Sequence, residues 1–215
     1  MKKLFVMLIV LATVVPAWAI PLGDPGFESG VPFLASGAGA NSQGWWIYLN
    51  DPANENAAVV TSPVYEGSYA AQLYTGNGSS AQIGQDTDFS PGWPVDVEVA
   101  YYVPAGSWNG AGITIQYKDV DWAYINYAYV PMYNYTSTGG GDSAWHVFIG
   151  DSTSTGAEGL WTAPEGTVHV SFKIEQWGWT SGNGSVYDNA VVSPEPATML
   201  LLGLGGLALI RRKRA

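Results

Sequence analysis

The chain has 215 residues, no cysteine and a formal net charge of −10 at pH 7. Six of its eight basic residues lie near the two ends, so residues 20–193 hold only Lys118 and Lys173 against 17 carboxylates, a net charge of −15. A body this acidic repels phosphate backbones and anionic lipid surfaces, which excludes nucleic acid as an expected partner. Because cysteine is absent, disulfides cannot stabilise the fold and the hydrophobic core must suffice.

The first 19 residues have the three regions of a secretory signal peptide. Residues 2–3 are lysines, residues 4–15 are apolar, and residues 17–19 form a small-x-small cleavage signal. Residues 1–19 are therefore excluded from the fold, and the mature chain is expected to begin at Ile20.

The body, residues 20–193, has the usual size of one domain and many strand signals. Polar and apolar residues alternate with a period of two in four longer segments: 95–103, 113–118, 123–129 and 168–175. Shorter candidate strands are 57–61, 69–74, 80–84, 145–149 and 185–192. Clusters of glycine, proline and asparagine separate them and supply turn conformations. This pattern, about nine or ten short strands, predicts a single all-β domain, a β-sandwich or jelly roll.

Three short motifs resemble, in chain order, landmarks of jelly-roll carbohydrate-binding modules. Residues 23–30 contain the triplet Gly-Phe-Glu and resemble the opening strand of that family. Residues 66–70 resemble its turn into the next core strand, and residues 186–191 resemble its closing strand. The resemblance implies a jelly-roll β-sandwich that binds carbohydrate without catalysis.

The same resemblance implies a structural Ca²⁺ where the first and last strands meet. By carry-over, the backbone oxygen of Gly26 and the carboxylates of Glu28 and Asp188 would bind the ion, with a carbonyl near Ser68 as a further ligand. Calcium accepts carbonyl and carboxylate oxygens in flexible geometry, so this donor set suits it. The alternative is that Glu28 and Asp188 are ordinary polar residues on edge strands.

Aromatic residues are more numerous than a core of this size needs, with nine tryptophans and 13 tyrosines after residue 19. Because tryptophan is seldom completely buried, several rings are expected at the surface, where they can stack on sugar rings. Trp177 and Trp179, two residues apart, are expected on one sheet face. Trp45 and Trp46 form a second candidate platform, beside Gln43, Tyr48 and Asn50. The alternative is that each pair packs into the sandwich or covers its edge.

Signals for catalysis are weak. The sequence has no Gly-x-Ser-x-Gly elbow, and His146 and His169 lack the spacing of metal ligands, so both are expected to be strand residues that face solvent. Three pairs of carboxylates lie at strand ends or on exposed faces, where solubility explains them: Asp86 and Asp88, Asp96 and Glu98, and Asp119 and Asp121. We therefore predict a protein that is not an enzyme, with a polysaccharide hydrolase as an alternative.

The last 22 residues combine Pro194-Glu195-Pro196, an uncharged apolar run (197–210) and a basic tail (211–215). The four cations of the tail are Arg211, Arg212, Lys213 and Arg214. A helix over the run would be about 21 Å long, short of the roughly 30 Å hydrocarbon core. The cations resist translocation, which favours a short transmembrane helix with a cytoplasmic C-terminus. The alternatives are a plain tail anchor or a buried core helix.

This arrangement, residues 194–215, resembles the PEP-CTERM sorting signal of Gram-negative bacteria. The resemblance implies that the protein is anchored transiently in the inner membrane and that an exosortase cleaves near Pro194-Glu195-Pro196. The mature protein would then reach the cell surface, the exopolysaccharide or the extracellular matrix. Together with the body, the signal predicts an exported protein that binds polysaccharide. The alternative is a structural or adhesion protein of the matrix without a specific ligand.

Overall fold

The computed structural model describes residues 22–76, 79–134, 141–179 and 184–193. Within those ranges every regular element is a β-strand. None of the described segments is a helix with the length and apolar character needed to cross a bilayer. The expected signal peptide, residues 1–19, and the expected sorting signal, residues 194–215, lie outside the described residues.

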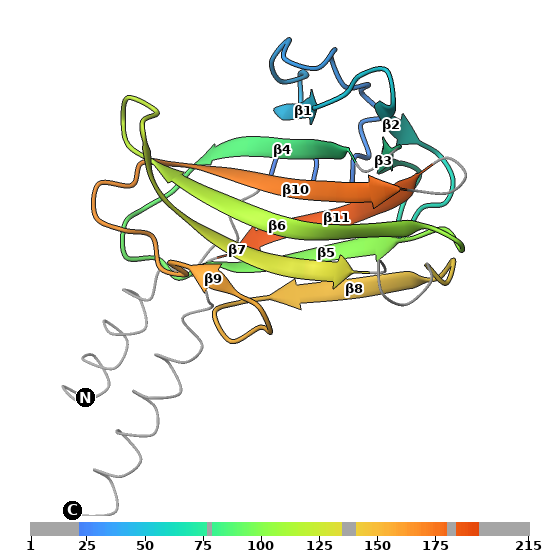
Figure 1. Cartoon of the computed structure of the whole chain (residues 1–215). Helices are drawn as coiled ribbons and strands as arrows, with labels where there is room; N and C mark the ends of the chain where they lie inside the picture. Colours follow the sequence, from blue (N-terminus) through green and yellow to red (C-terminus); the bar gives the residue numbers. More distant parts are fainter. Residues whose placement is uncertain (1–21, 77–78, 135–140, 180–183, 194–215) are drawn as a thin grey trace, which may run out of the picture.

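The strands form two antiparallel sheets that face each other as a sandwich (Figure 1). The six-stranded sheet has the order β1 (Trp45–Leu49), β4 (Ser80–Asp88), β10 (His169–Trp179), β6 (Trp108–Lys118), β7 (Tyr124–Asn134) and β9 (Glu158–Gly159). The five-stranded sheet has the order β2 (Glu55–Val60), β3 (Ala70–Thr75), β11 (Ser185–Ser193), β5 (Asp96–Tyr102) and β8 (Trp145–Gly150). This architecture confirms the all-β sandwich expected from the sequence.

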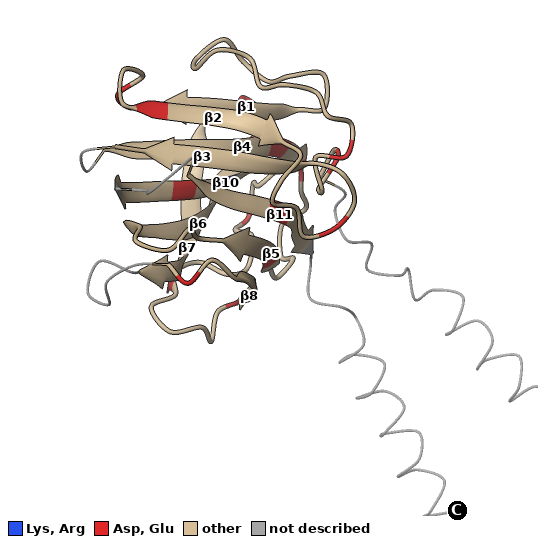
Figure 2. Ribbon diagram, turned by 90° about the vertical axis from the view of Figure 1, so that its right-hand side faces the viewer, with Lys and Arg blue, Asp and Glu red and all other residues tan. Residues whose placement is uncertain are grey.

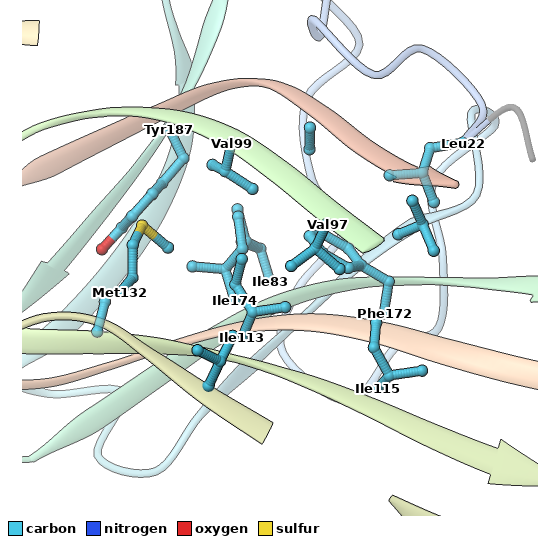
Figure 3. Close-up of a cluster of buried hydrophobic side chains, with 14 of the residues drawn as sticks. Leu22, Ile83, Val97, Val99, Ile113, Ile115, Met132, Phe172, Ile174 and Tyr187 are labelled. Atoms are coloured by element: carbon cyan, nitrogen blue, oxygen red, sulfur yellow. The ribbon is translucent and has the colours of Figure 1, made fainter. Parts of the chain in front are cut away.

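The alternation of polar and apolar residues places one face of each strand in the core. On β10, Phe172 and Ile174 are fully buried and pair across the sheet with Ile115 and Ile113 of β6. Figure 3 shows these side chains close to Val97 of the five-stranded sheet, in the space between the two layers. The outward-facing residues of the same strands are consequently free to form a surface.

A buried polar network links the two sheets inside this core. The side-chain amide of Gln176 on β10 donates to the Leu73 carbonyl and the Thr75 hydroxyl on β3, at 3.2 and 2.9 Å. The Tyr187 hydroxyl on β11 donates to the Gln176 oxygen at 2.7 Å, and the Tyr133 hydroxyl lies 2.7 Å from that of Tyr187. Burial raises the pKa of Tyr187 well above its ordinary value, so this hydroxyl keeps its proton. The network therefore fixes how the two sheets face each other.

Residues 23–30 correct one expectation, because they form tight turns instead of an opening strand. Asp24 and Phe27 have φ angles of +55° and +57°, which an extended strand does not contain. The turns are closed by backbone hydrogen bonds from the Phe27 N–H to the Asp24 carbonyl and from the Gly30 N–H to the Phe27 carbonyl. Glu28 consequently projects from a turn and not from a strand.

Candidate functional site

The outer face of the six-stranded sheet carries polar and aromatic side chains in regular rows. The register of β1, β4, β10, β6 and β7 places five residues in one row: Trp46, Gly84, Lys173, Thr114 and Tyr129. The row on one side contains Tyr48, Gln82, Glu175 and Gly112, and the row on the other contains Asp86, Ser171, Gln116 and Tyr127. Neighbouring strands are about 4.8 Å apart, so a row of five spans roughly 19 Å. That length suits an extended ligand.

Three aromatic rings on this face lie on glycines of the neighbouring strand. A methyl group on Gly110 would meet Cε2, Cζ2 and Nε1 of Trp177 all at 2.8 Å, and these equal distances place the face of the indole over the glycine. The other two pairs are Trp46 on Gly84 and Tyr129 on Gly112, with nearest distances of 2.4 and 2.5 Å. Glycine permits this approach because it has no Cβ. All three rings are half-buried, so each keeps part of its surface exposed to solvent.

A cavity of about 490 Å³, here called the sheet cavity, lies on this face beside residues 37–40. Its lining combines aromatic, amide, hydroxyl and charged side chains: Trp46, Tyr48, Gln82, Asp86, Gln116, Lys118, Ser171 and Lys173. Tyr48 is 49% exposed, and Ser171 donates a hydrogen bond to Asp86. An aromatic surface with a few convergent polar groups is typical of a binding site for a small molecule or an oligomer.

The charges in the sheet cavity come from strands β4, β6 and β10. The Lys118 ammonium is 3.8 Å from an Asp86 carboxylate oxygen and 5.3 Å from the centroid of the Trp122 ring. Lys173 has no ion pair or hydrogen bond to another residue in the described part of the chain. Burial lowers the pKa of the Lys173 ammonium, while the nearby Glu175 and Asp86 carboxylates act in the opposite direction.

The two histidines are strand residues, as expected, with side chains 36% (His146) and 15% (His169) exposed, and each also packs against an aromatic ring. His169 lies flat under the indole of Trp122, with ring centroids 4.0 Å apart and planes 5° apart. His146 stacks on Tyr101 at 5.2 Å and hydrogen bonds with Asp142 at 2.9 Å. Each imidazole therefore has a structural role as an aromatic neighbour.

The four tryptophans expected to bind carbohydrate lie in different places. Trp46 and Trp177 are on the outer face of the six-stranded sheet, as required for binding. Trp45 is 1% exposed and packs against Phe27 in the core, with ring centroids 4.7 Å apart. Trp45 therefore belongs to the core and not to a binding platform, because adjacent strand residues face opposite sides. The side chain of Trp179 lies outside the described residues.

Sequence reasoning did not single out Tyr129 or Lys173 for this face. Both belong to the central row only through strand pairing, which a single sequence does not reveal. The repeated glycines Gly110 and Gly112 were an available signal, because glycine within a strand often marks a close approach by another group. Here the approaching groups are aromatic rings.

A second cavity, of about 440 Å³ and here called the acidic cavity, brings together the residues expected to bind calcium. It is lined by Asp24, Pro25, Gly26, Glu28, Glu66, Gly67, Asp188 and Asn189. Four of these eight residues are carboxylates, and none is a lysine or arginine. By charge and donor type, the lining suits a divalent cation.

Glu28 and Asp188 also hold the segment between β2 and β3 in place. Both oxygens of Glu28 accept the Ser68 N–H, at 2.9 and 3.1 Å. Asp188, which is fully buried, accepts the N–H groups of Tyr65, Glu66 and Asn189 at 2.9, 3.2 and 2.7 Å. Burial raises the pKa of the Asp188 carboxyl above its ordinary value. Among the described residues, no group of three or more His, Cys, Asp or Glu side chains is placed to hold a metal, so a calcium ion would also need backbone carbonyl oxygens.

Residues 194–214 match the model of the PEP-CTERM protein-sorting motif. The chain carries a PEP-CTERM sorting signal. This match confirms the prediction made from Pro194-Glu195-Pro196, the apolar run and the basic tail, and the PEP-CTERM motif implies export and processing by an exosortase. No curated protein matches the chain in sequence.

Several solved structures share the sandwich. The enzymatically active domain of tailspike protein 4 from bacteriophage CBA120 has a TM-score of 0.54 and 10% identity over 83% of this chain and 21% of its own. A carbohydrate-binding module of the β-sandwich superfamily has a TM-score of 0.52 and 16% identity over 79% of this chain and 61% of its own. The Stig cyclase Fisc from Fischerella sp. TAU, in complex with an indole compound, has a TM-score of 0.54 and 16% identity. The match covers 83% of this chain and 98% of the cyclase.

These similarities show that the body shares the β-sandwich fold with a carbohydrate-binding module. The PEP-CTERM chain covers only part of the first two matched proteins, so their activities do not transfer with the fold. The same sandwich also occurs in a cyclase, which illustrates that a fold carries different functions on different sites. The function must therefore be argued from this chain's own outer face.

Proposed function

We propose that this PEP-CTERM protein is exported to the cell surface or extracellular matrix and binds a polysaccharide there without cleaving it. The observation that carries the proposal is the outer face of the six-stranded sheet, where the rings of Trp46, Tyr129 and Trp177 each lie against a glycine of the neighbouring strand and Trp46 lines the sheet cavity. On the route outward, the protein would be held briefly in the inner membrane, with its basic tail in the cytoplasm, until an exosortase acts near Pro194-Glu195-Pro196.

The chemistry of this face matches that of a sugar chain. A pyranose has an apolar face that packs on a flat aromatic ring and hydroxyl groups that need hydrogen-bond partners. Trp46 supplies a ring at the sheet cavity, and Gln82, Gln116 and Ser171 supply amide and hydroxyl groups beside it. The rows of outward-facing residues place further aromatic and polar side chains across several strands. The surface therefore suits an oligomer better than a single sugar.

The first test is Trp46→Ala, measured by isothermal titration of the purified protein with soluble oligosaccharides. Removing a ring that buries a sugar face loses about 2 kcal/mol, so we expect affinity to fall roughly 30-fold. Trp93→Ala is the matched control, because Trp93 is also exposed, at 41%, but lies outside the sheet cavity. We expect this control to bind normally.

Two outcomes would count against the proposal. If no soluble glycan binds, or if Trp46→Ala binds as well as the wild type, the outer face of the six-stranded sheet is not a carbohydrate site. If the protein instead releases new reducing ends from a polysaccharide, it is a hydrolase, and neutralising a carboxylate pair such as Asp86 and Asp88 should abolish that activity.

The acidic cavity supports a second part of the proposal, a structural Ca²⁺ held by the Gly26 carbonyl and the carboxylates of Glu28 and Asp188. The support is the convergence of these residues in a cavity with four carboxylates and no lysine or arginine. Such an ion would offset the repulsion between Glu28 and Asp188 and tie the turn before β1 to β11. The ion would supply charge neutralisation and cross-linking, and no catalytic step.

The calcium proposal predicts that EDTA lowers the melting temperature. A ligand at 100 times its Kd stabilises the folded state by about 2.7 kcal/mol, which corresponds to a shift of roughly 5–10 °C for a domain of this size. Differential scanning calorimetry with millimolar calcium or EDTA measures the shift. Glu28→Gln should lose the response, whereas Asp151→Asn, in a loop outside the acidic cavity, should keep it. An identical melting curve in calcium and in EDTA would remove Gly26, Glu28 and Asp188 as ligands.

One observation favours an alternative function, self-association in the matrix. β8 is an edge strand of the five-stranded sheet, and its outer residues Val147 and Ile149 are 44% and 65% exposed. Exposed apolar edge strands tend to pair with other chains. Sedimentation velocity over a range of concentrations tests this alternative, which requires oligomers that Ile149→Lys disrupts.

A further inference from the structure

The only two cations of the body lie together. Between residues 20 and 193 the sequence has two basic residues, Lys118 and Lys173. They stand on the adjacent strands β6 and β10, both point to the outer face, and both line the sheet cavity. In the view of Figure 2, acidic residues are spread over loops and strands, and no lysine is visible. Positive charge is therefore concentrated at the proposed binding site of an otherwise acidic body.

Lys118 has partners within the protein. Its ammonium is paired with Asp86 at 3.8 Å and lies 5.3 Å from the centre of the Trp122 ring. Trp122 in turn covers His169. These contacts satisfy the Lys118 charge, so this residue chiefly neutralises Asp86 and organises the edge of the sheet cavity.

Lys173 has no such partner in the described part of the chain. It stands in the central row, between Gly84 on β4 and Thr114 on β6, and the Trp46 ring covers that glycine. Neither cross-strand neighbour is a carboxylate, and the side chain is half-buried. Glu175, two residues along the same face of β10, acts on the ammonium through space but forms no ion pair with it in the described part of the chain. A half-buried ammonium loses hydration without gaining an ion pair, which is unfavourable unless an anion binds next to it.

We propose that the polysaccharide bound at this face is anionic, with a carboxylate or sulfate group that pairs with the Lys173 ammonium while Trp46 stacks on the sugar ring. The inference rests on the proposed function and names its class of ligand. Uronate and sulfate share the required chemistry, because the lysine ammonium is a compact point charge that accepts either anion.

The net charge of the body opposes this ligand only at a distance. At physiological ionic strength the Debye length is about 8 Å, so carboxylates elsewhere on the surface are largely screened. A direct contact inside the sheet cavity is screened much less. Of the two carboxylates that act on Lys173, Asp86 lines the sheet cavity and is offset by Lys118, whereas Glu175 lies on the same strand outside the lining of the cavity. The local charge at Lys173 therefore outweighs the distant repulsion.

The test compares polygalacturonate with its fully methyl-esterified form, two polymers with the same backbone that differ in charge. Isothermal titration of the purified protein should show at least about 10-fold tighter binding of the charged form, because hydrogen bonds to charged groups contribute about 1.5–3 kcal/mol. Lys173→Gln should lose this preference and still bind the neutral form. Lys173→Arg should keep the preference. Dextran sulfate compared with dextran tests sulfate in the same way.

The outcomes separate this inference from the proposed function. A preference for polygalacturonate or for dextran sulfate that disappears in Lys173→Gln supports the inference and identifies the anion. Equal binding of charged and neutral polymers that depends on Trp46 overturns the inference but leaves the proposed function intact. If no polymer binds, the proposed function fails and the inference fails with it.

Discussion

Replacing Trp45 by alanine is expected to lower the free energy of unfolding by about 3–5 kcal/mol. Trp45 is 1% exposed, stacks against Phe27 and meets the edge of Phe172, with ring centroids 4.7 and 6.3 Å apart. Its indole N–H donates to the Asp24 carbonyl at 3.1 Å and so ties the turn before β1 to the core. Trp45→Ala removes these contacts and leaves a cavity. Urea unfolding followed by far-UV circular dichroism measures the loss.

The next residue along the same strand provides the control. Trp46 faces outward over Gly84, so Trp46→Ala should change the free energy of unfolding by about 1 kcal/mol or less, while it weakens glycan binding. Trp45→Ala should do the reverse, with binding retained at temperatures where the variant is folded. If Trp45→Ala weakened binding without loss of stability, the assignment of the two tryptophans to opposite faces would be wrong.

Strands were predicted well where polar and apolar residues alternate with a period of two in the sequence. The expected segment 113–118 lies in β6, and 168–175 matches β10 except for its first residue; these are the central strands of the six-stranded sheet. Alternation did not reveal β1, because Trp45–Leu49 contains only apolar and aromatic residues and shows no period of two in the sequence. It also missed β9, which has two residues and pairs only with β7.

The candidate site was less predictable than the strands, because it depends on register. From the sequence, Trp45 and Trp46 were equally good candidates for carbohydrate binding. Only the pairing of Trp46 with Gly84 shows that the Trp46 ring lies on the outer face. Likewise, Lys118 and Lys173 are distant in sequence and line the same cavity only because β6 pairs with β10. The convergence of Glu28 and Asp188 was anticipated from a family resemblance, since no local spacing connects the two ends of the domain.

Replacing Gln176 by leucine is expected to cost about 3 kcal/mol although the volume of the side chain hardly changes. Gln176 is fully buried and makes three hydrogen bonds, two to β3 and one from Tyr187 on β11. Leucine removes the amide donor to the Leu73 carbonyl and the Thr75 hydroxyl and the acceptor of the Tyr187 hydroxyl, and each of the three lost hydrogen bonds contributes about 0.5–1.5 kcal/mol. The midpoint of urea unfolding reports the loss, and Gln72→Leu, on β3 but only half-buried, is the matched control.

A double-mutant cycle separates the hydrogen bond from the packing. Tyr187→Phe alone leaves the Gln176 oxygen without its donor, whereas Gln176→Leu alone removes the Gln176 oxygen and leaves the Tyr187 hydroxyl next to the Tyr133 hydroxyl. The double variant removes both groups, so we expect its loss to be smaller than the sum of the single losses by about 1 kcal/mol. Strictly additive losses would mean that the two side chains act independently. The relative orientation of the two sheets would then depend on apolar packing alone.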